Sequence, residues 1–171
     1  CRSVFEKERK VMDREIHEIA PVFDTHSKIM ILGSFPSVKS REGKFFYHHP
    51  QNRFWKVLAG ILKCEVPDTE KREMLLNHGI AVWDVVASCE IEGSSDSSIK
   101  NVIPNDLERV LSKADIAQIY TNGATASRLY KKYCYGKIHM EDIKLPSTSP
   151  ANASYSLEKL MDAWKIICET L

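Results

Sequence analysis

Short apolar runs separate longer amphipathic stretches along most of this chain. Residues 29–32 are four consecutive apolar side chains between Lys28 and Gly33, and residues 80–86 form a longer, mostly apolar run. A short run without a polar face predicts a strand that is buried on both sides, as in a parallel sheet. Two further runs follow the same pattern. The predicted strands span residues 29–32, 80–86, 116–120 and 144–145.

The stretches between these runs repeat apolar residues every three or four positions, which is the period of an α-helix. The clearest stripe belongs to the last stretch, from Leu157 to Leu171. Pro104 suits the first turn of a helix, because a proline there gives up no hydrogen bond. A looser pattern predicts a helix at the start of the chain. The predicted helices cover residues 4–19, 53–63 and 69–77, a segment that starts near Pro104, a segment that follows Asn122-Gly123, and residues 157–171.

The order of these elements is one helix followed by four alternations of strand and helix. Such alternation is typical of a mainly parallel sheet with helices on both faces. We therefore expect an α/β fold of three layers, α/β/α, around a central, mainly parallel four-stranded sheet. The length of 171 residues suits a single domain over residues 1–171, in which residues 1–20 are an N-terminal helix.

Composition and charge narrow the class of protein. Apolar residues make up 43% of the chain, which is enough for a packed interior. No apolar run approaches the ~18 residues of a membrane span, so we expect no membrane association. The formal net charge is only +1. Any contact with nucleic acid must therefore come from a local basic patch.

The five cysteines are widely spaced and include no C-x-x-C pair. This spacing is typical of reduced structural thiols rather than of disulfides or an iron–sulfur cluster. We expect a cytoplasmic protein, associated with the nucleoid if the organism is prokaryotic. We expect no organic cofactor and no metal, because His48 and His49 lack a third ligand at a suitable spacing.

The segment after the first predicted strand carries the candidate chemistry. Residues 33–37 form a turn-rich break, and a loop that is both basic and aromatic follows. Ligands of α/β proteins bind beyond the carboxyl ends of strands. The loop therefore favours an anionic, aromatic ligand such as nucleic acid. The polar segment 88–98 follows another strand end, and we expect it to be a loop on the same face. The basic and aromatic residues of the first loop are Lys39, Arg41, Lys44, Phe45, Phe46, Tyr47, His48 and His49.

Three motifs resemble those of the uracil-DNA glycosylase superfamily. They are Gly-Ser-Phe-Pro-Ser at 33–37, His-Pro-Gln-Asn-Arg-Phe-Trp-Lys at 49–56, and Pro-Ser-Thr-Ser-Pro-Ala-Asn at 146–152. Within the superfamily, the chain is most similar to the hypoxanthine-DNA (deoxyinosine) glycosylase branch. Phe35 stands where mismatch-specific uracil enzymes place a water-handling asparagine, and Ser147 stands where classical uracil enzymes place a histidine. These departures favour the hypoxanthine branch. The resemblance runs from the first strand to the C-terminus and leaves out residues 1–20.

The resemblance implies an enzyme, a DNA-deoxyinosine glycosylase, that flips a deaminated base out of DNA and hydrolyses its N-glycosidic bond. It implies that Asn52 is the catalytic residue, whose amide orients water and hydrogen-bonds the base. It implies no lyase activity, since no lysine occupies a position that the family uses as an amine nucleophile. The expected partner is DNA containing deaminated bases, with no obligate protein partner.

The other predicted site residues fall into two groups. One group would hold the flipped base, through backbone groups and through aromatic stacking, with Tyr47 in the stacking position of the mismatch-specific enzymes. The other group would hold phosphates through hydroxyl, amide and backbone groups. The base pocket comprises Gly33, Ser34, Phe35, Pro36, Phe45, Phe46, Tyr47 and Asp84. The DNA contacts comprise Ser37, Ser40, Arg41, His49, Asn122, Ser147, Ser149 and Asn152.

Several of these residues also have a structural interpretation. Asn52 precedes a predicted helix, where asparagine is a favoured N-cap, and one residue can fill both roles. Phe54 and Trp55 fit the apolar stripe of that helix. Asp84, at the end of a buried strand, either makes a structural pair or faces the pocket. The functional alternatives are removal of uracil or xanthine, mismatch-specific excision, and a damaged-DNA binding module without catalysis.

Overall fold

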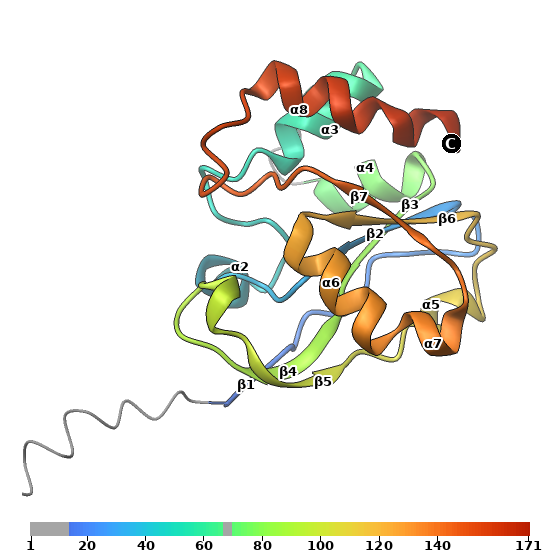
Figure 1. Ribbon diagram of the computed structural model, residues 1–171. Helices are drawn as coiled ribbons and strands as arrows, with labels where there is room; N and C mark the ends of the chain where they lie inside the picture. Colours follow the sequence, from blue (N-terminus) through green and yellow to red (C-terminus); the bar gives the residue numbers. More distant parts are fainter. Residues whose placement is uncertain (1–13, 67–69) are drawn as a thin grey trace, which may run out of the picture.

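The computed structural model describes residues 14–66 and 70–171, and its centre is a four-stranded sheet (Figure 1). The strands lie in the order β3-β2-β6-β7, and each neighbouring pair is parallel. The prediction of an α/β fold around a parallel four-stranded sheet is confirmed. The strand bounds are β2 (Ile29–Gly33), β3 (Ile80–Asp84), β6 (Gln118–Asn122) and β7 (Asp142–Leu145).

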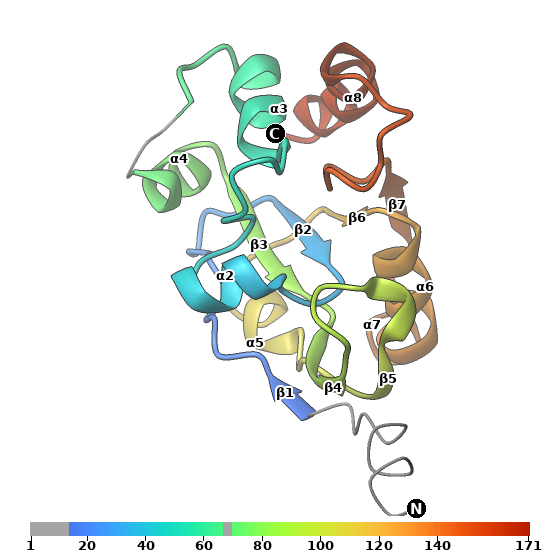
Figure 2. The same cartoon turned by 90° about the vertical axis from the view of Figure 1, so that its left-hand side faces the viewer.

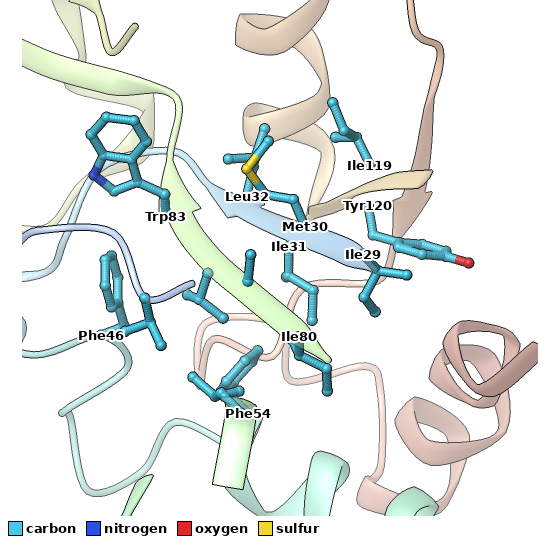
Figure 3. Close-up of a cluster of buried hydrophobic side chains, with 14 of the residues drawn as sticks. Ile29, Met30, Ile31, Leu32, Phe46, Phe54, Ile80, Trp83, Ile119 and Tyr120 are labelled. Atoms are coloured by element: carbon cyan, nitrogen blue, oxygen red, sulfur yellow. The ribbon is translucent and has the colours of Figure 1, made fainter. Parts of the chain in front are cut away.

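Burial on both faces explains why the short apolar runs form strands. Every residue of β2 and of β3 is buried. Figure 3 shows the side chains of β2 gathered with those of its neighbours and with two rings from the segment that follows β2, Phe46 and Phe54. The hydrophobic core therefore reaches from the centre of the sheet to the loop that carries the candidate chemistry.

Helices lie on both sides of this sheet (Figure 1). On one side α3 (Phe54–Leu62) packs against α8 (Leu157–Trp164), and on the other side α6 (Ala124–Tyr133) runs along β6 and β7. None of the helices in the described residues has the length and apolar character that a membrane crossing requires. The shorter helices are α2 (Val38–Gly43), α4 (Lys71–Asn77), α5 (Glu108–Leu111), α7 (Tyr135–Ile138) and the 3₁₀ turns η1 (Asp96–Ser98) and η2 (Lys165–Glu169).

A second, antiparallel sheet was not predicted. It consists of β1 (Arg14–Ile16), β4 (Val86–Glu90) and β5 (Lys100–Pro104), in the order β1-β4-β5. The prediction of a helix over residues 4–19 is therefore wrong from residue 14 onward, and residues 4–13 lie outside the described residues. Pairing with β4 gives the backbone groups of this segment partners that a helix would otherwise have supplied.

The predicted strand over residues 80–86 is divided between the two sheets. β3 ends at Asp84, and the Val85 amide donates to the Gly33 carbonyl oxygen at 2.9 Å. The Asn105 side chain secures the same corner, because its Nδ2 donates to the Asp84 carbonyl oxygen at 2.9 Å. The chain thus turns out of the parallel sheet directly beyond Asp84, whose backbone is held in place.

One further expectation about this region is wrong, and another is confirmed only in part. Pro104 ends β5 rather than starting a helix, because the last residue of an edge strand needs no N–H donor. The nearby helix α5 begins at Glu108. The polar segment 88–98 begins inside β4, so only its later part is the expected loop.

The four parallel strands end at one edge of the sheet, where the candidate residues meet. Gly33, Asp84, Asn122 and Leu145 are the last residues of β2, β3, β6 and β7. In Figure 2, α2 and the segment between β4 and β5 lie on either side of the end of β2.

Candidate active site

The strand ends and the loops that follow them surround a cavity of about 350 Å³. This volume lies within the ~300–1,000 Å³ that is typical of small-molecule sites. The walls come from the turn after β2, the loop before α3, the ends of β3 and β6, and the loop after β7. The lining residues are Gly33, Ser34, Phe35, Pro36, Ser37, Ser40, Phe46, Tyr47, His49, Asn52, Asp84, Ser94, Asp96, Asn122, Ser147, Thr148, Ser149, Pro150 and Ala151.

Most of the predicted site residues line this cavity, but three do not. Phe45 stacks on Trp55, with ring centroids 6.0 Å apart. Arg41 donates to the carbonyl oxygen of Gly93 at 2.7 Å, and Asn152 bonds within its own loop. Those that the structure brings together are Gly33, Ser34, Phe35, Pro36, Ser37, Ser40, Phe46, Tyr47, His49, Asn52, Asp84, Asn122, Ser147 and Ser149.

Part of the wall comes from the loop that was expected on this face within residues 88–98, although sequence analysis assigned none of its residues to the site. The segment between β4 and β5 folds back over the turn after β2, where Ser34 Oγ donates to Asp96 Oδ1 at 2.9 Å and the Val38 amide donates to Ser94 Oγ at 2.9 Å. Burial raises the pKa of Asp96, the hydrogen bond from Ser34 opposes that rise, and the nearby Asp84 adds to it. The position of this segment after a strand end was the available signal. The residues missed are Ser94, Asp96, Thr148, Pro150 and Ala151.

The Asn52 side chain is held in one orientation by two hydrogen bonds to its oxygen. Oδ1 accepts from the Phe54 amide at 3.0 Å and from the Thr148 hydroxyl at 2.9 Å. Since both donors approach Oδ1, the amide group is oriented with that atom toward the protein. Asn52 therefore bonds the first residue of α3, although the N-cap position itself is Arg53, and its Nδ2 is left as a donor for the cavity that Asn52 lines.

Thr148 and Asn122 form a fixed support behind Asn52. The Thr148 hydroxyl accepts from Asn122 Nδ2 at 3.0 Å before donating to Asn52, and the Thr148 amide donates to Asn122 Oδ1 at 3.0 Å. Thr148 is fully buried. Because the Thr148 hydroxyl accepts from Asn122, its own proton is directed toward Asn52.

The other residues of the Asn-Arg-Phe-Trp box build the walls around Asn52. Arg53 donates to the carbonyl oxygens of Ser149 and Asn152, both at 2.9 Å, so it fastens the loop after β7. Phe54 stacks on the ring of Tyr47, with centroids 3.9 Å apart. Core packing, which sequence analysis favoured for Phe54 and Trp55, is confirmed by their burial. The box therefore fixes one amide, one loop and one aromatic wall together.

Tyr47 is held in a strained conformation with an unpaired hydroxyl. Its φ is +51°, in the left-handed region that bulky residues avoid. The Trp55 indole N–H holds the Tyr47 carbonyl oxygen at 3.1 Å. The hydroxyl is buried near Asn122 and Asp84 but makes no hydrogen bond of good geometry within the described residues. Burial, reinforced by the charge of Asp84, raises the pKa of Tyr47, so this hydroxyl stays neutral.

Asp84 forms a buried pair with His17, from the segment after β1. His17 Nε2 lies 2.8 Å from Asp84 Oδ2, and both side chains are almost fully buried. His17 Nδ1 accepts from the Ile19 amide at 3.2 Å, so the ring proton is on Nε2, which donates to Asp84. Asp84 Oδ1 faces Gly33, where a Cβ would lie only 2.3 Å away. Position 33 therefore has to be glycine for Asp84 to reach the cavity. Asp84 both makes a structural pair and faces the pocket.

Four basic side chains form a basic face on α6 and β7. Arg128, Lys131, Lys132 and Lys144 line a shallow hollow on α6 and β7, together with Ala124 and Ser127. None of the four basic side chains forms an ion pair within residues 14–66 and 70–171. Because Asn122 lines the cavity and α6 begins at Ala124, the N-terminal end of this face starts two residues along the chain from the cavity wall.

The described part of the chain holds no candidate metal centre. It contains no group of three His, Cys, Asp or Glu side chains that could ligate one ion. The rings of His48 and His49 lie apart, since His49 lines the cavity whereas His48 packs against Gly43.

Comparisons with known proteins agree with the sequence motifs. The family model of the uracil DNA glycosylase superfamily matches residues 20–169. A curated protein of Methanosarcina acetivorans, named hypoxanthine DNA glycosylase, is 34% identical over 141 residues, which cover 79% of this chain and 87% of that protein. A protein of the same name from Methanosarcina barkeri is 34% identical over 84 residues, which cover 47% of this chain and 53% of that protein.

A solved structure agrees as well. The solution NMR structure of a candidate uracil DNA glycosylase from Methanosarcina acetivorans superposes with a TM-score of 0.72 and 29% identity, covering 87% of this chain and 93% of that one. The chain therefore belongs to the uracil DNA glycosylase superfamily. It is a DNA glycosylase, an enzyme whose substrate is DNA.

Proposed function

We propose that this DNA glycosylase releases hypoxanthine, the product of adenine deamination, from DNA. The observation that carries the proposal is the orientation of Asn52, which presents a donor and not an acceptor to the cavity. Hypoxanthine carries acceptors at O6, N7 and N3, and a donor at these positions stabilises the negative charge that develops on the departing base. The names of the two curated relatives support the same substrate.

The base would enter the cavity by flipping out of the helix. Phe35, Phe46 and Tyr47 are among the residues that line the cavity, and stacking on an aromatic ring contributes ~1–3 kcal/mol per base. Phe54 supports Tyr47 from its other side. This arrangement compensates part of the cost of unstacking the nucleotide.

Hydrolysis without strand cleavage fits the groups around the cavity. A lyase step needs an amine nucleophile that attacks the sugar. No lysine is present among the described residues that line the cavity. We therefore infer that the products are a free base and an intact strand with an abasic site.

The DNA backbone would cross the basic face on α6 and β7. The net charge of the protein is only +1, but these four basic side chains form no ion pair among the described residues and so attract phosphates locally. Ser147 and Ser149, at the mouth of the cavity, would hold the phosphates next to the flipped nucleotide. Arg41 and Asn152 do not line the cavity, and contact of either residue with DNA remains a prediction.

The test is a panel of duplexes that each contain one deaminated base: hypoxanthine, xanthine or uracil. Release is followed by alkaline cleavage of the abasic site, and samples without alkali test for lyase activity. The proposal expects the strand of the hypoxanthine duplex to be cut in samples treated with alkali and to stay intact in samples without alkali. Scission confined to the uracil duplex would contradict the substrate, and scission without alkali would contradict the hydrolytic mechanism.

A further inference from the structure

The NH₂ group of Asn52 can bond an acceptor on a deaminated base, but it cannot bond the ring N–H beside that acceptor. Hypoxanthine presents a carbonyl oxygen, O6, beside a ring N–H, N1, so it has an acceptor next to a donor. Asn52 Oδ1 is already engaged by the Phe54 amide and by Thr148, so its side chain supplies donors only. A protein group that accepts the N1–H must come from another part of the cavity, because a buried donor left without a partner is costly.

Asp84 Oδ1 has the properties of that acceptor. The residue is 4% exposed and lines the cavity floor at the end of β3. Oδ2 is engaged by His17 at 2.8 Å, whereas no described residue bonds Oδ1. The backbone of Asp84 is held by Asn105, and its carboxylate is held by His17. One oxygen is thus anchored and the other faces Gly33 and Tyr47.

The other acid in the cavity is a weaker candidate. Asp96 also lines the cavity, but Ser34 already donates to its Oδ1. The unpaired Tyr47 hydroxyl lies near Asp84 on the cavity floor and would gain a partner when a base enters. Two polar atoms without a hydrogen-bond partner in the described residues, Asp84 Oδ1 and the Tyr47 hydroxyl, therefore lie near Asp84 rather than near Asp96.

We propose that Asp84 accepts the ring N–H of the flipped base and so selects bases in which an N–H stands next to a carbonyl. Hypoxanthine and xanthine have this edge at N1 and O6, and uracil has it at N3 and O4. Adenine has a lone pair at N1, which a carboxylate repels, so unmodified adenine is rejected. His17 is a positioning residue that acts through Asp84. The inference rests on the proposed glycosylase reaction and names the class of base that it takes.

The sharpest test combines one methyl group on the base with one atom change on the protein. Duplexes that contain inosine or 1-methylinosine are compared, since the methyl group replaces the N1–H donor, and the bulk that it adds is the same for both proteins. Asp84→Asn keeps the shape and the hydrogen bond from His17, because the new Oδ1 accepts it, but it turns an NH₂ group toward the base. Single-turnover excision and lesion binding by fluorescence anisotropy are measured for both proteins with both duplexes.

The wild-type protein should favour inosine over 1-methylinosine by roughly 10- to 100-fold, which is the range for loss of a hydrogen bond to a charged group. In Asp84→Asn this preference should be smaller by roughly 10-fold or more, in excision or, if excision is too slow, in binding, because the hydrogen bond that the methyl group removes is already absent. His17→Gln, which keeps a donor to Asp84, should retain the preference, and His17→Ala should reduce it.

Two results would overturn the inference. Equal use of inosine and 1-methylinosine by the wild-type protein would show that the N1–H is not read. A preference that persists unchanged in Asp84→Asn, with both rates lowered by the same factor and binding unaffected, would show that Asp84 acts on the attacking water instead. Failure of the wild-type protein to release hypoxanthine from any duplex contradicts the proposed function itself, and so is distinct from either result.

Discussion

The Thr148 hydroxyl donates to Asn52 Oδ1 at 2.9 Å, across 96 positions of sequence. The bond joins the loop after β7 to the loop before α3 at the wall of the cavity. It reinforces the orientation that the Phe54 amide sets, because a backbone N–H can only donate and the opposite orientation of Asn52 would place its NH₂ group against that donor. The orientation of one amide is therefore set by hydrogen bonds to two other segments of the protein.

Removing this hydroxyl should impair the reaction without removing Asn52. In Thr148→Val the side chain keeps its shape, but Asn52 loses one of its two partners and Asn122 Nδ2 is left unpaired. We expect the single-turnover excision rate to fall by about 5- to 30-fold, equivalent to 1–2 kcal/mol. The free energy of unfolding, measured by denaturant titration, should fall by ~1–3 kcal/mol. Thr148→Ser keeps the hydroxyl and serves as the control, and an equal loss of rate in this variant would contradict the role of the hydroxyl.

The unpaired hydroxyl of Tyr47 predicts opposite effects on stability and function. Tyr47→Phe removes a buried polar atom that has no partner in the described structure, so the free energy of unfolding should rise by about 1 kcal/mol. Affinity for an inosine duplex should fall, since the hydroxyl finds its partner only when a base occupies the cavity. Thermal unfolding and anisotropy titration measure the two effects. A destabilised variant with normal affinity would show that the hydroxyl is satisfied in the free protein.

The basic face should account for part of the salt dependence of DNA binding. Each lysine that neutralises one phosphate contributes ~0.9 to the slope of log K against log salt concentration. The double variant Lys131→Gln, Lys132→Gln should therefore bind lesion duplex with a shallower slope, by about 1.8 if both contact phosphates. Lys165→Gln is the matched control, because Lys165 is exposed and paired with Asp162 at the end of α8. An equal change of slope in both variants would place the DNA elsewhere.

The cysteines should differ in reactivity according to burial. Burial raises the pKa of Cys89 to about 11 and that of Cys134 to about 11, so at pH 8 each has less thiolate than an ordinary thiol. Iodoacetamide at pH 8, followed by peptide mass spectrometry, should modify the exposed Cys64 and Cys168 first. Labelling of Cys89 and Cys134 should rise only as the pH approaches 11 in the folded protein. Rapid labelling of either at pH 8 would contradict its burial.

The parallel sheet could be predicted because its strands are buried on both faces and therefore appear as short apolar runs. The second sheet could not, because β1 consists of three residues, two of them charged, and such an edge strand has no pattern that separates it from a helix end. The boundary between β3 and β4 was missed for a similar reason. Residues 80–86 are apolar throughout except at Asp84, and the turn beyond it depends on bonds to Gly33 and Asn105, which are distant in sequence.

The motifs predicted which segments meet at the cavity, but not what each residue does there. Asn52 was expected to handle water and the base, yet whether it offers an oxygen or an NH₂ group depends on the bonds that it accepts from the Phe54 amide and from Thr148. His17 could not be connected with Asp84, since they are separated by 67 positions and no motif includes the histidine. Sequence spacing thus identified the site, while the hydrogen bonds between its segments assign donors and acceptors.

The central claim is that Asn52 acts through its NH₂ group, and Asn52→Asp tests this most directly. The substitution keeps the size of the side chain and both hydrogen bonds that Oδ1 accepts, and it replaces only the donor with a second oxygen. Single-turnover release of hypoxanthine should fall by at least about 100-fold, as when one donor to a developing charge is removed. Binding of the inosine duplex should be retained far better by Asn52→Ala, in which no second oxygen faces the base. Hypoxanthine release by Asn52→Asp at the wild-type rate would contradict the account.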